Sequence, residues 1–153
     1  MEDSSTREQA REILDTMLGY LGFMPTIDDD PTVDGVGFQV AGGETDKLIG
    51  DNGRTLDDLQ YLLNRFLNIR HPDAGRVRLD IHFYRVQQES EMIEQIQTMA
   101  EAVRNGGQPI TLRPMNSYDR RLVHNAFAED PHLESWSPGG RDRLKRITIR
   151  PKR

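Results

Sequence analysis

The chain has 153 residues, no cysteine and a formal net charge of −5, with 20 Lys and Arg against 25 Asp and Glu. It therefore forms neither disulfides nor thiolate metal sites, and its overall charge argues mildly against nucleic-acid binding. The sequence contains no signal-peptide pattern and no run of about 18 apolar residues, which predicts a cytoplasmic protein without membrane insertion.

Hydrophobic periodicity and turn-forming residues predict the elements of the first part of the chain. In chain order these are a helix over 6–21, two strands within 23–43, a short helix over 44–49, a glycine turn at 50–53, a helix that begins at Thr55, and a strand over 76–84. The apolar side chains that we expect the helix after Thr55 to turn toward a core are Leu56, Leu59, Leu62, Leu63, Phe66 and Leu67. On the strand, we expect Asp80 and His82 to be a solvated pair rather than a catalytic dyad.

The second part begins with a longer helix, which apolar spacing places around Met92–Val103 and which ends at the Asn-Gly-Gly of 105–107. The elements predicted after it are a strand over 109–114, a helix that begins at Asn116, and two strands within 131–136 and 144–150. We therefore predict an α+β fold of two small domains, residues 1–84 and 85–153, with the longer helix as the joint.

The charges are unevenly distributed between these parts. Residues 1–112 carry 10 Lys and Arg against 20 Asp and Glu, whereas residues 113–153 carry 10 against 5. Such an asymmetry indicates a division of labour, in which the C-terminal part would bind an anionic partner. The alternative is a chance feature of surface composition.

A Gly-x-x-Gly turn between two helices, flanked by strands, is typical of a KH domain, where the turn clamps the nucleic-acid backbone. Here the turn and the residue after it are Gly50, Asp51, Asn52, Gly53 and Arg54. The acidic Asp51 adds repulsion where a phosphodiester would lie, and Arg54 compensates in part. We expect the turn to be kept and its grip on phosphate to be weakened.

Arg120 and His124 lie four residues apart on the last predicted helix, so their side chains share one face. Arg offers a planar set of donors suited to phosphate, and His can stack on a base or donate a hydrogen bond. The alternative is an ordinary solvated helix face. The other basic residues that we assign to the same site are Arg113, Arg121, Arg146 and Arg150.

Other chemistry is sparse. The four histidines show no metal-ligand spacing and no serine lies in a nucleophile elbow, so we expect no metal, no cofactor and no catalysis. Trp136 and Tyr118 are candidates for base stacking, with packing in the core or at the joint as the alternative.

Two blocks of the sequence resemble the Jag (KhpB, SpoIIIJ-associated) family of bacterial RNA-binding proteins. Residues 44–83, with "KLIGDNGRTLDDLQYLLNRFLN", resemble its KH domain. Residues 110–151, with "RPMNSYDRRLVHNAFAEDPHLES" and "RITIRPK", resemble its R-3-H domain, whose Arg-x-x-x-His motif is met by Arg120 and His124. Members of this family often carry a further N-terminal domain, for which we expect no room in this chain.

The resemblance implies a KH domain of the prokaryotic (type II) strand order, followed by an R-3-H domain whose three-stranded sheet packs on helices. It implies a non-catalytic protein that binds single-stranded RNA or single-stranded DNA and acts as an RNA chaperone or post-transcriptional regulator. A separate KH-domain protein or a second copy of the chain is the implied protein partner. The alternative function is a protein-interaction or dimerisation module whose KH domain has lost nucleic-acid binding.

Overall fold

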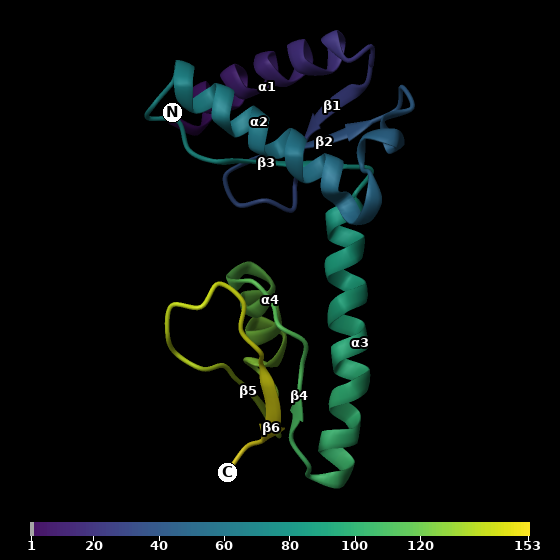
Figure 1. The fold of residues 1–153 in the computed structure, drawn as a ribbon, viewed down its shortest axis with the longest axis vertical. Helices are drawn as coiled ribbons and strands as arrows, with labels where there is room; N and C mark the ends of the chain where they lie inside the picture. The colour runs from purple at the N-terminus through teal and green to yellow at the C-terminus, as the bar shows by residue number, and fades with distance from the viewer. Residues whose placement is uncertain (1) are drawn as a thin grey trace. The chain divides into compact units, whose positions relative to one another are not determined.

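The computed structural model describes residues 2–153, and the chain divides between Arg85 and Val86 into two compact units (Figure 1). We call these the N-terminal unit and the C-terminal unit. Each unit combines helices with a three-stranded sheet and has a hydrophobic core of its own. The predicted α+β class is therefore confirmed.

The N-terminal unit follows the predicted order of elements. Its elements are α1 (Glu2–Tyr20), β1 (Thr26–Asp29), β2 (Val36–Ala41), the 3-10 turns η1 (Thr45–Leu48) and η2 (Asp51–Gly53), α2 (Arg54–Arg70) and β3 (Val77–Ile81). The sheet order is β1-β2-β3, with β1 antiparallel and β3 parallel to β2. Parallel strands need a long crossover, and the segment from η1 to α2 supplies it.

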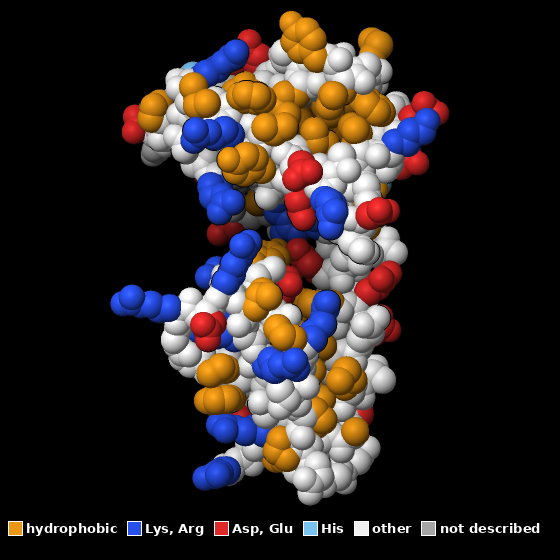
Figure 2. All heavy atoms as spheres, viewed as in Figure 1, with side chains coloured by type: hydrophobic (Ala, Val, Ile, Leu, Met, Phe, Trp, Pro, Cys, Tyr) orange, Lys and Arg blue, Asp and Glu red, His pale blue; other side chains and the backbone are white. Residues whose placement is uncertain are grey.

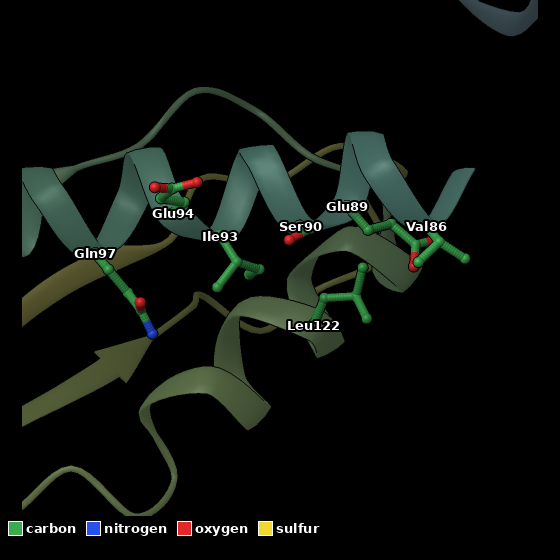
Figure 3. Close-up of a pocket in the computed structure, with 7 residues that line it drawn as sticks. All are labelled: Val86, Glu89, Ser90, Ile93, Glu94, Gln97 and Leu122. Carbon is green, nitrogen blue, oxygen red and sulfur yellow. The ribbon is translucent and has the colours of Figure 1, made fainter. Parts of the chain in front are cut away.

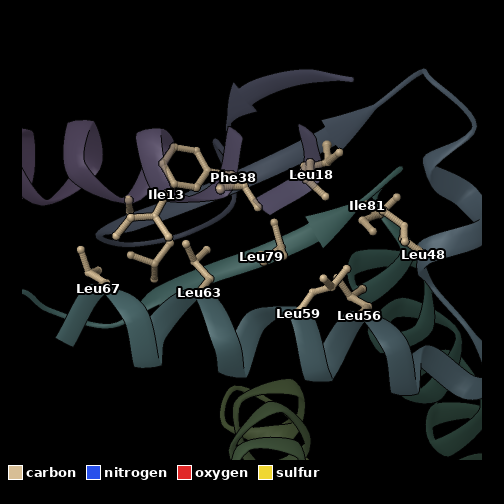
Figure 4. Packing of buried hydrophobic residues seen from close by; sticks show 14 of the residues in the cluster. Ile13, Leu18, Phe38, Leu48, Leu56, Leu59, Leu63, Leu67, Leu79 and Ile81 are labelled. Carbon is tan, nitrogen blue, oxygen red and sulfur yellow. The ribbon is translucent and has the colours of Figure 1, made fainter. Parts of the chain in front are cut away.

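One face of this sheet forms the core together with both helices. Phe38 pairs with Leu79 and Val40 pairs with Ile81 across β2 and β3, and all four side chains are buried. Ile13 and Leu18 of α1 and the leucines of α2 pack on these rows (Figure 4). Truncating a buried side chain such as Phe38 to Ala would cost about 3–5 kcal/mol.

The apolar face of α2 differs from the prediction. Leu56, Leu59, Leu63 and Leu67 are buried, but Leu62 and Phe66 are 40% and 42% exposed. They continue into a second apolar stripe on the outer side of the helix, which also contains Tyr61 and Ile69. The periodicity of α2 therefore combines two adjacent faces, of which only one lies in the core.

The expectation of a solvated Asp80 is wrong, because Asp80 is fully buried on the other face of β3. The Nε2 of Gln39 donates to Asp80 at 3.1 Å and to the buried Asp30 at 2.8 Å. Asp80 also accepts from the backbone amides of Ile81 and Arg85. Buried carboxylates are tolerated only with such partners, and here they fix the course of the chain after β3.

The C-terminal unit contains most of α3 (Tyr84–Gly106), then β4 (Ile110–Thr111), α4 (Ser117–Phe127), β5 (Leu133–Trp136) and β6 (Thr148–Pro151). Its sheet has the order β4-β6-β5 and is antiparallel throughout. The helices α3 and α4 cover one face, where Ile147 and Ile149 lie fully buried. Asn116 caps α4 by accepting from the amide of Asp119 at 2.9 Å.

A carboxylate closes the turn between α4 and β5. Asp130 accepts two hydrogen bonds from Arg104 of α3 and one from each of the amides of His132 and Leu133. Arg104 above all, with these two amides, holds the pKa of Asp130 well below its usual range, against a smaller opposing effect of burial. The ion pair thus joins α3 to the start of β5.

Candidate nucleic-acid interface

Arg120 and His124 lie on one face of α4, as their spacing predicts, and both are half-buried. Nη1 of Arg120 donates to the backbone oxygen of Met115 at 2.7 Å. This bond uses one of the five donors of the guanidinium and leaves the others for a ligand. We call the surface formed by Arg120 and His124 the Arg/His face.

The ring of His124 is held by two serines. Its Nδ1 lies 2.6 Å from Oγ of Ser135 on β5, and its Nε2 lies 3.3 Å from Oγ of Ser137. Because a hydroxyl can donate or accept, either neutral tautomer can satisfy both bonds. The ring nitrogens are therefore engaged within the protein, and the faces of the ring are the parts left for stacking.

Ser135 and Ser137 were missed in the sequence. Their signal is the alternation of "SWS", because residues two apart on a strand point to the same side. Ser135 pairs with the buried Ile149 and thus lies on the side of the sheet that α4 covers. Only the packing of α4 on β5 shows that His124 contacts Ser135 on this side of the sheet.

The structure does not bring all the predicted basic residues together. Arg121 is exposed on α4, whereas Arg113, Arg146 and Arg150 follow β4 or lie on and beside β6. Arg146 donates to the backbone oxygen of Leu112 at 3.3 Å, and Arg150 forms a 2.6 Å ion pair with Glu134. These predicted site residues thus separate into an α4 set and a sheet set.

Further positive charge lies on the segment between β5 and β6. Arg141 and Arg143 are exposed there, and Nζ of Lys145 donates to the backbone oxygen of Gly140 at 2.6 Å. Figure 2 shows several Lys and Arg side chains on the visible face of the C-terminal unit. The excess of basic residues after residue 112 is therefore a surface property of this unit.

Not every surface of the C-terminal unit is suited to an anion. An open groove of about 470 Å³ lies between α3 and α4 (Figure 3). Ile93 and Leu122 provide apolar walls, and Glu89 and Glu94 line it as well. Two carboxylates would repel phosphate, so the groove does not belong to the candidate interface.

The predicted glycine turn is present in the N-terminal unit, and both of its glycines are required. Gly50 has φ of 72° and Gly53 has φ of 76°. A Cβ on Gly50 would lie 2.8 Å from Cβ of Thr55, and a Cβ on Gly53 would lie 2.8 Å from the ring of Tyr84. Only glycine combines this backbone conformation with such close approaches.

Backbone hydrogen bonds close the end of the turn and the start of α2. The amides of Gly53, Arg54 and Leu56 donate to the backbone oxygens of Gly50, Asp51 and Ile49, respectively. Asp51, Asn52 and Arg54 are exposed, and no side chain caps the start of α2. Asp51 therefore does not act as a cap, and its side chain is exposed to solvent.

Two kinds of feature are absent from residues 2–153. No group of three or more His, Asp or Glu side chains in this range is arranged to hold a metal ion. No helix within the same range combines the length and apolar character that a membrane-spanning segment needs.

In the C-terminal unit, a helix with the Arg-x-x-x-His motif packs on an antiparallel sheet. Residues 90–151 of this unit match the R-3-H domain family. The chain is also related to proteins named RNA-binding protein KhpB. It is 36% identical over 92 residues to the one from Clostridium symbiosum, which covers 60% of this chain and 41% of that protein.

Two other relatives with the same name are more distant. The protein from Lactiplantibacillus plantarum is 30% identical over 102 residues, covering 67% of this chain and 31% of that protein. The protein from Bacillus subtilis is 25% identical over 135 residues, covering 86% and 64%. This chain thus spans less than two thirds of the length of these three relatives. The predicted relationship to the Jag family is confirmed, whereas the KH assignment of residues 1–84 stays a prediction.

Proposed function

We propose that this chain is a non-catalytic protein that binds single-stranded RNA, with the C-terminal unit as its main contact. The observation that carries the proposal is the Arg/His face, which lies in the unit where basic residues outnumber acidic ones. Phosphate contacts by Arg dominate the affinity of such proteins, and unpaired bases stack on exposed rings. The names of the KhpB relatives support the same assignment.

We propose further that residues 1–84 are a KH domain of the prokaryotic strand order with a weakened loop. The order of its elements and the two required glycines support this. The exposed carboxylate of Asp51 argues that its contribution to RNA affinity is small. The proposed cellular role is that of a cytoplasmic RNA chaperone or post-transcriptional regulator.

The test is a titration of the full chain with fluorescently labelled single-stranded RNA at several salt concentrations. We expect log Kd to change with log salt by about 0.7 for each phosphate contact. Arg121→Glu on α4 should weaken binding. Arg70→Glu on α2 is the matched control, because Arg70 is likewise exposed but lies outside the C-terminal unit, and it should leave binding unchanged. A flat salt dependence, or equal effects of the two variants, would overturn the proposal.

A second candidate function is favoured by the exposed apolar stripe of α2. Tyr61 and Ile69 are 68% and 64% exposed, and they belong to the same helix as the exposed Leu62 and Phe66. Hydrophobic side chains gather on the visible face of the N-terminal unit (Figure 2). Exposed apolar side chains gathered on one helix face are typical of a protein contact. We therefore propose that the N-terminal unit binds a protein partner, a second copy of the chain or a separate KH-domain protein.

Self-association is tested first, by light scattering of the full chain over a range of concentrations. If α2 forms the contact between copies, Phe66→Glu should shift the chain to the monomer. Met24→Glu is the matched control, because Met24 is 93% exposed and lies outside α2. A monomer at every concentration would exclude the second copy and leave the separate KH-domain protein as the partner to be tested.

A further inference from the structure

The sheet of the C-terminal unit has one open face. Leu133, Ile147 and Ile149 point to the side covered by α3 and α4 and are buried. Thr148 lies between two of these residues and so points to the opposite side. The strand register places Thr111 and Trp136 on either side of Thr148, and the hydroxyls of Thr111 and Thr148 lie 3.3 Å apart.

We call this open side the outer sheet face. Its most prominent side chain is Trp136, which is 47% exposed. The guanidinium of Arg150 lies over the Trp136 ring at 5.8 Å from its centre, and Glu134 fixes this guanidinium through a 2.6 Å ion pair. The indole is thus held by its neighbours while nearly half of the residue remains accessible. A large exposed ring held in this way is suited to stack on an unpaired base.

Positive charge extends along the same face. The amide of Leu112 donates to the backbone oxygen of Ile147 at 2.8 Å, so the ladder between β4 and β6 continues past both strand ends. Leu112 and Ile147 are buried, and the residues next to them, Arg113 and Arg146, are exposed. Alternation therefore places both arginines on the outer side. Glu134 of β5 also lies on this side, two residues from Trp136. Its negative charge is paired with Arg150.

The strand β5 links this face to the Arg/His face. It lies at the edge of the sheet, and Ser135 and Trp136 are neighbours on it that point to opposite sides. Ser135 holds the ring of His124, whereas Trp136 lies on the outer side. A single-stranded nucleic acid that contacts His124 can therefore pass around the edge of the sheet at β5 to reach Trp136.

We propose that the outer sheet face is a second contact surface for single-stranded RNA. Trp136 stacks on one base, Arg113 and Arg146 contact phosphates, and the hydroxyls of Thr111 and Thr148 lie beside the backbone of the nucleic acid. The inference rests on the proposed function, which it extends from the Arg/His face to the opposite side of β5. A double helix keeps its bases stacked within itself, so this surface selects single strands.

The chain contains one tryptophan and four tyrosines, so tryptophan emission that is excited selectively over the tyrosines reports on Trp136 alone. The experiment titrates the full chain with oligouridylate, and separately with an abasic ribose-phosphate oligomer of equal length. Binding is measured in parallel from the anisotropy of a label on each oligomer. We expect oligouridylate to quench the tryptophan fluorescence strongly and the abasic oligomer to quench it little at equal occupancy.

Variants of Trp136 supply the second measurement. Trp136→Leu should weaken binding of oligouridylate roughly 5- to 150-fold and leave binding of the abasic oligomer unchanged, because the loss is that of one base stack. Trp136→Phe should retain most of the affinity. Tyr20→Leu is the matched control, since Tyr20 is an exposed aromatic residue of the N-terminal unit.

The outcomes separate this inference from the proposed function. RNA binding by the full chain without quenching, or equal quenching by the two oligomers, overturns the stacking surface and leaves the proposed function intact. No binding of RNA by the full chain overturns both. If Trp136→Leu fails to fold, as judged by circular dichroism, the quenching of the unaltered chain still decides.

Discussion

His124 on α4 and Ser135 on β5 are joined by a hydrogen bond of 2.6 Å that fixes the imidazole of the Arg-x-x-x-His motif against the edge of the sheet. The bond joins a helix to a strand that lies 11 residues away in the chain. It makes the orientation of the ring a property of the α4–β5 packing and not of α4 alone.

Ser135→Ala removes the short bond to Nδ1, so the ring of His124 gains rotational freedom. We expect RNA affinity to fall by about 0.5–1.5 kcal/mol, the usual net contribution of one hydrogen bond. Ser137→Ala should have a smaller effect, because its bond is 3.3 Å long. Anisotropy titrations of both variants check this. Unchanged affinity in Ser135→Ala would mean that RNA does not depend on how the ring is held.

Arg120→Ala is expected to weaken RNA binding by about 1.5–3 kcal/mol, the range of hydrogen bonds to charged groups. It should also lower the free energy of unfolding by about 1 kcal/mol, because Nη1 no longer holds the backbone oxygen of Met115. Arg121→Ala is the matched control for stability and should leave the free energy of unfolding unchanged, because Arg121 is exposed. Denaturant unfolding and RNA titration give the two quantities. A loss of stability with full affinity per folded molecule would make Arg120 structural.

Gly50→Ala should destabilise the full chain more than Gly42→Ala. Both positions have a similar positive φ, 72° and 74°. The left-handed conformation therefore lowers the free energy of unfolding of both variants by about 1–2 kcal/mol. At Gly50 the new Cβ also lies 3.0 Å from the amide nitrogen of Thr55, whereas nothing lies within 4 Å at Gly42. Denaturant unfolding compares the two. Equal losses would show that the turn can relax around a side chain.

Asp51→Lys is expected to strengthen RNA binding, most clearly at low salt, because it replaces a repelling carboxylate by an attracting ammonium beside the turn. Asp73→Lys, at the exposed turn after α2, changes the net charge equally and is the control. RNA titrations at two salt concentrations measure the difference. Identical effects of the two variants would mean that the glycine turn has no privileged contact with phosphate.

The stability of the C-terminal unit should decrease at acid pH because of Asp130. The pKa of this carboxyl is lowered in the folded state, chiefly by Arg104, whereas the unfolded chain has the ordinary value of about 3.9. The stabilisation is therefore complete above about pH 4 and is lost as the pH falls toward the folded pKa. Asp130→Asn should reduce the slope of stability against pH in this range, and the exposed Asp142→Asn should not. Thermal unfolding between about pH 2 and pH 6 provides the comparison.

Sequence patterns alone predicted the order of the elements, the class of the fold and the position of the Arg-x-x-x-His motif. The glycine turn could be found because its requirement is local: two positions where only hydrogen fits in place of a side chain. Arg120 and His124 could be placed on one face because helical periodicity is also a local property.

The surroundings of each face depended on the tertiary structure. Leu62 and Leu63 are neighbours of equal hydrophobicity, yet the first is exposed and the second is fully buried. Asp80 resembles a solvent-facing residue in the alternation of β3, but Gln39 of the neighbouring strand and the start of α3 enclose it.

The same holds for the candidate interface. The basic residues after residue 112 form one cluster in the sequence, but the pleat of β5 places Trp136 on one side of the sheet and Ser135, which holds His124, on the other. Sequence spacing determines the direction of a side chain about its own helix or strand. Which partner covers that direction is decided by contacts between residues far apart in the chain, which only the folded structure brings together.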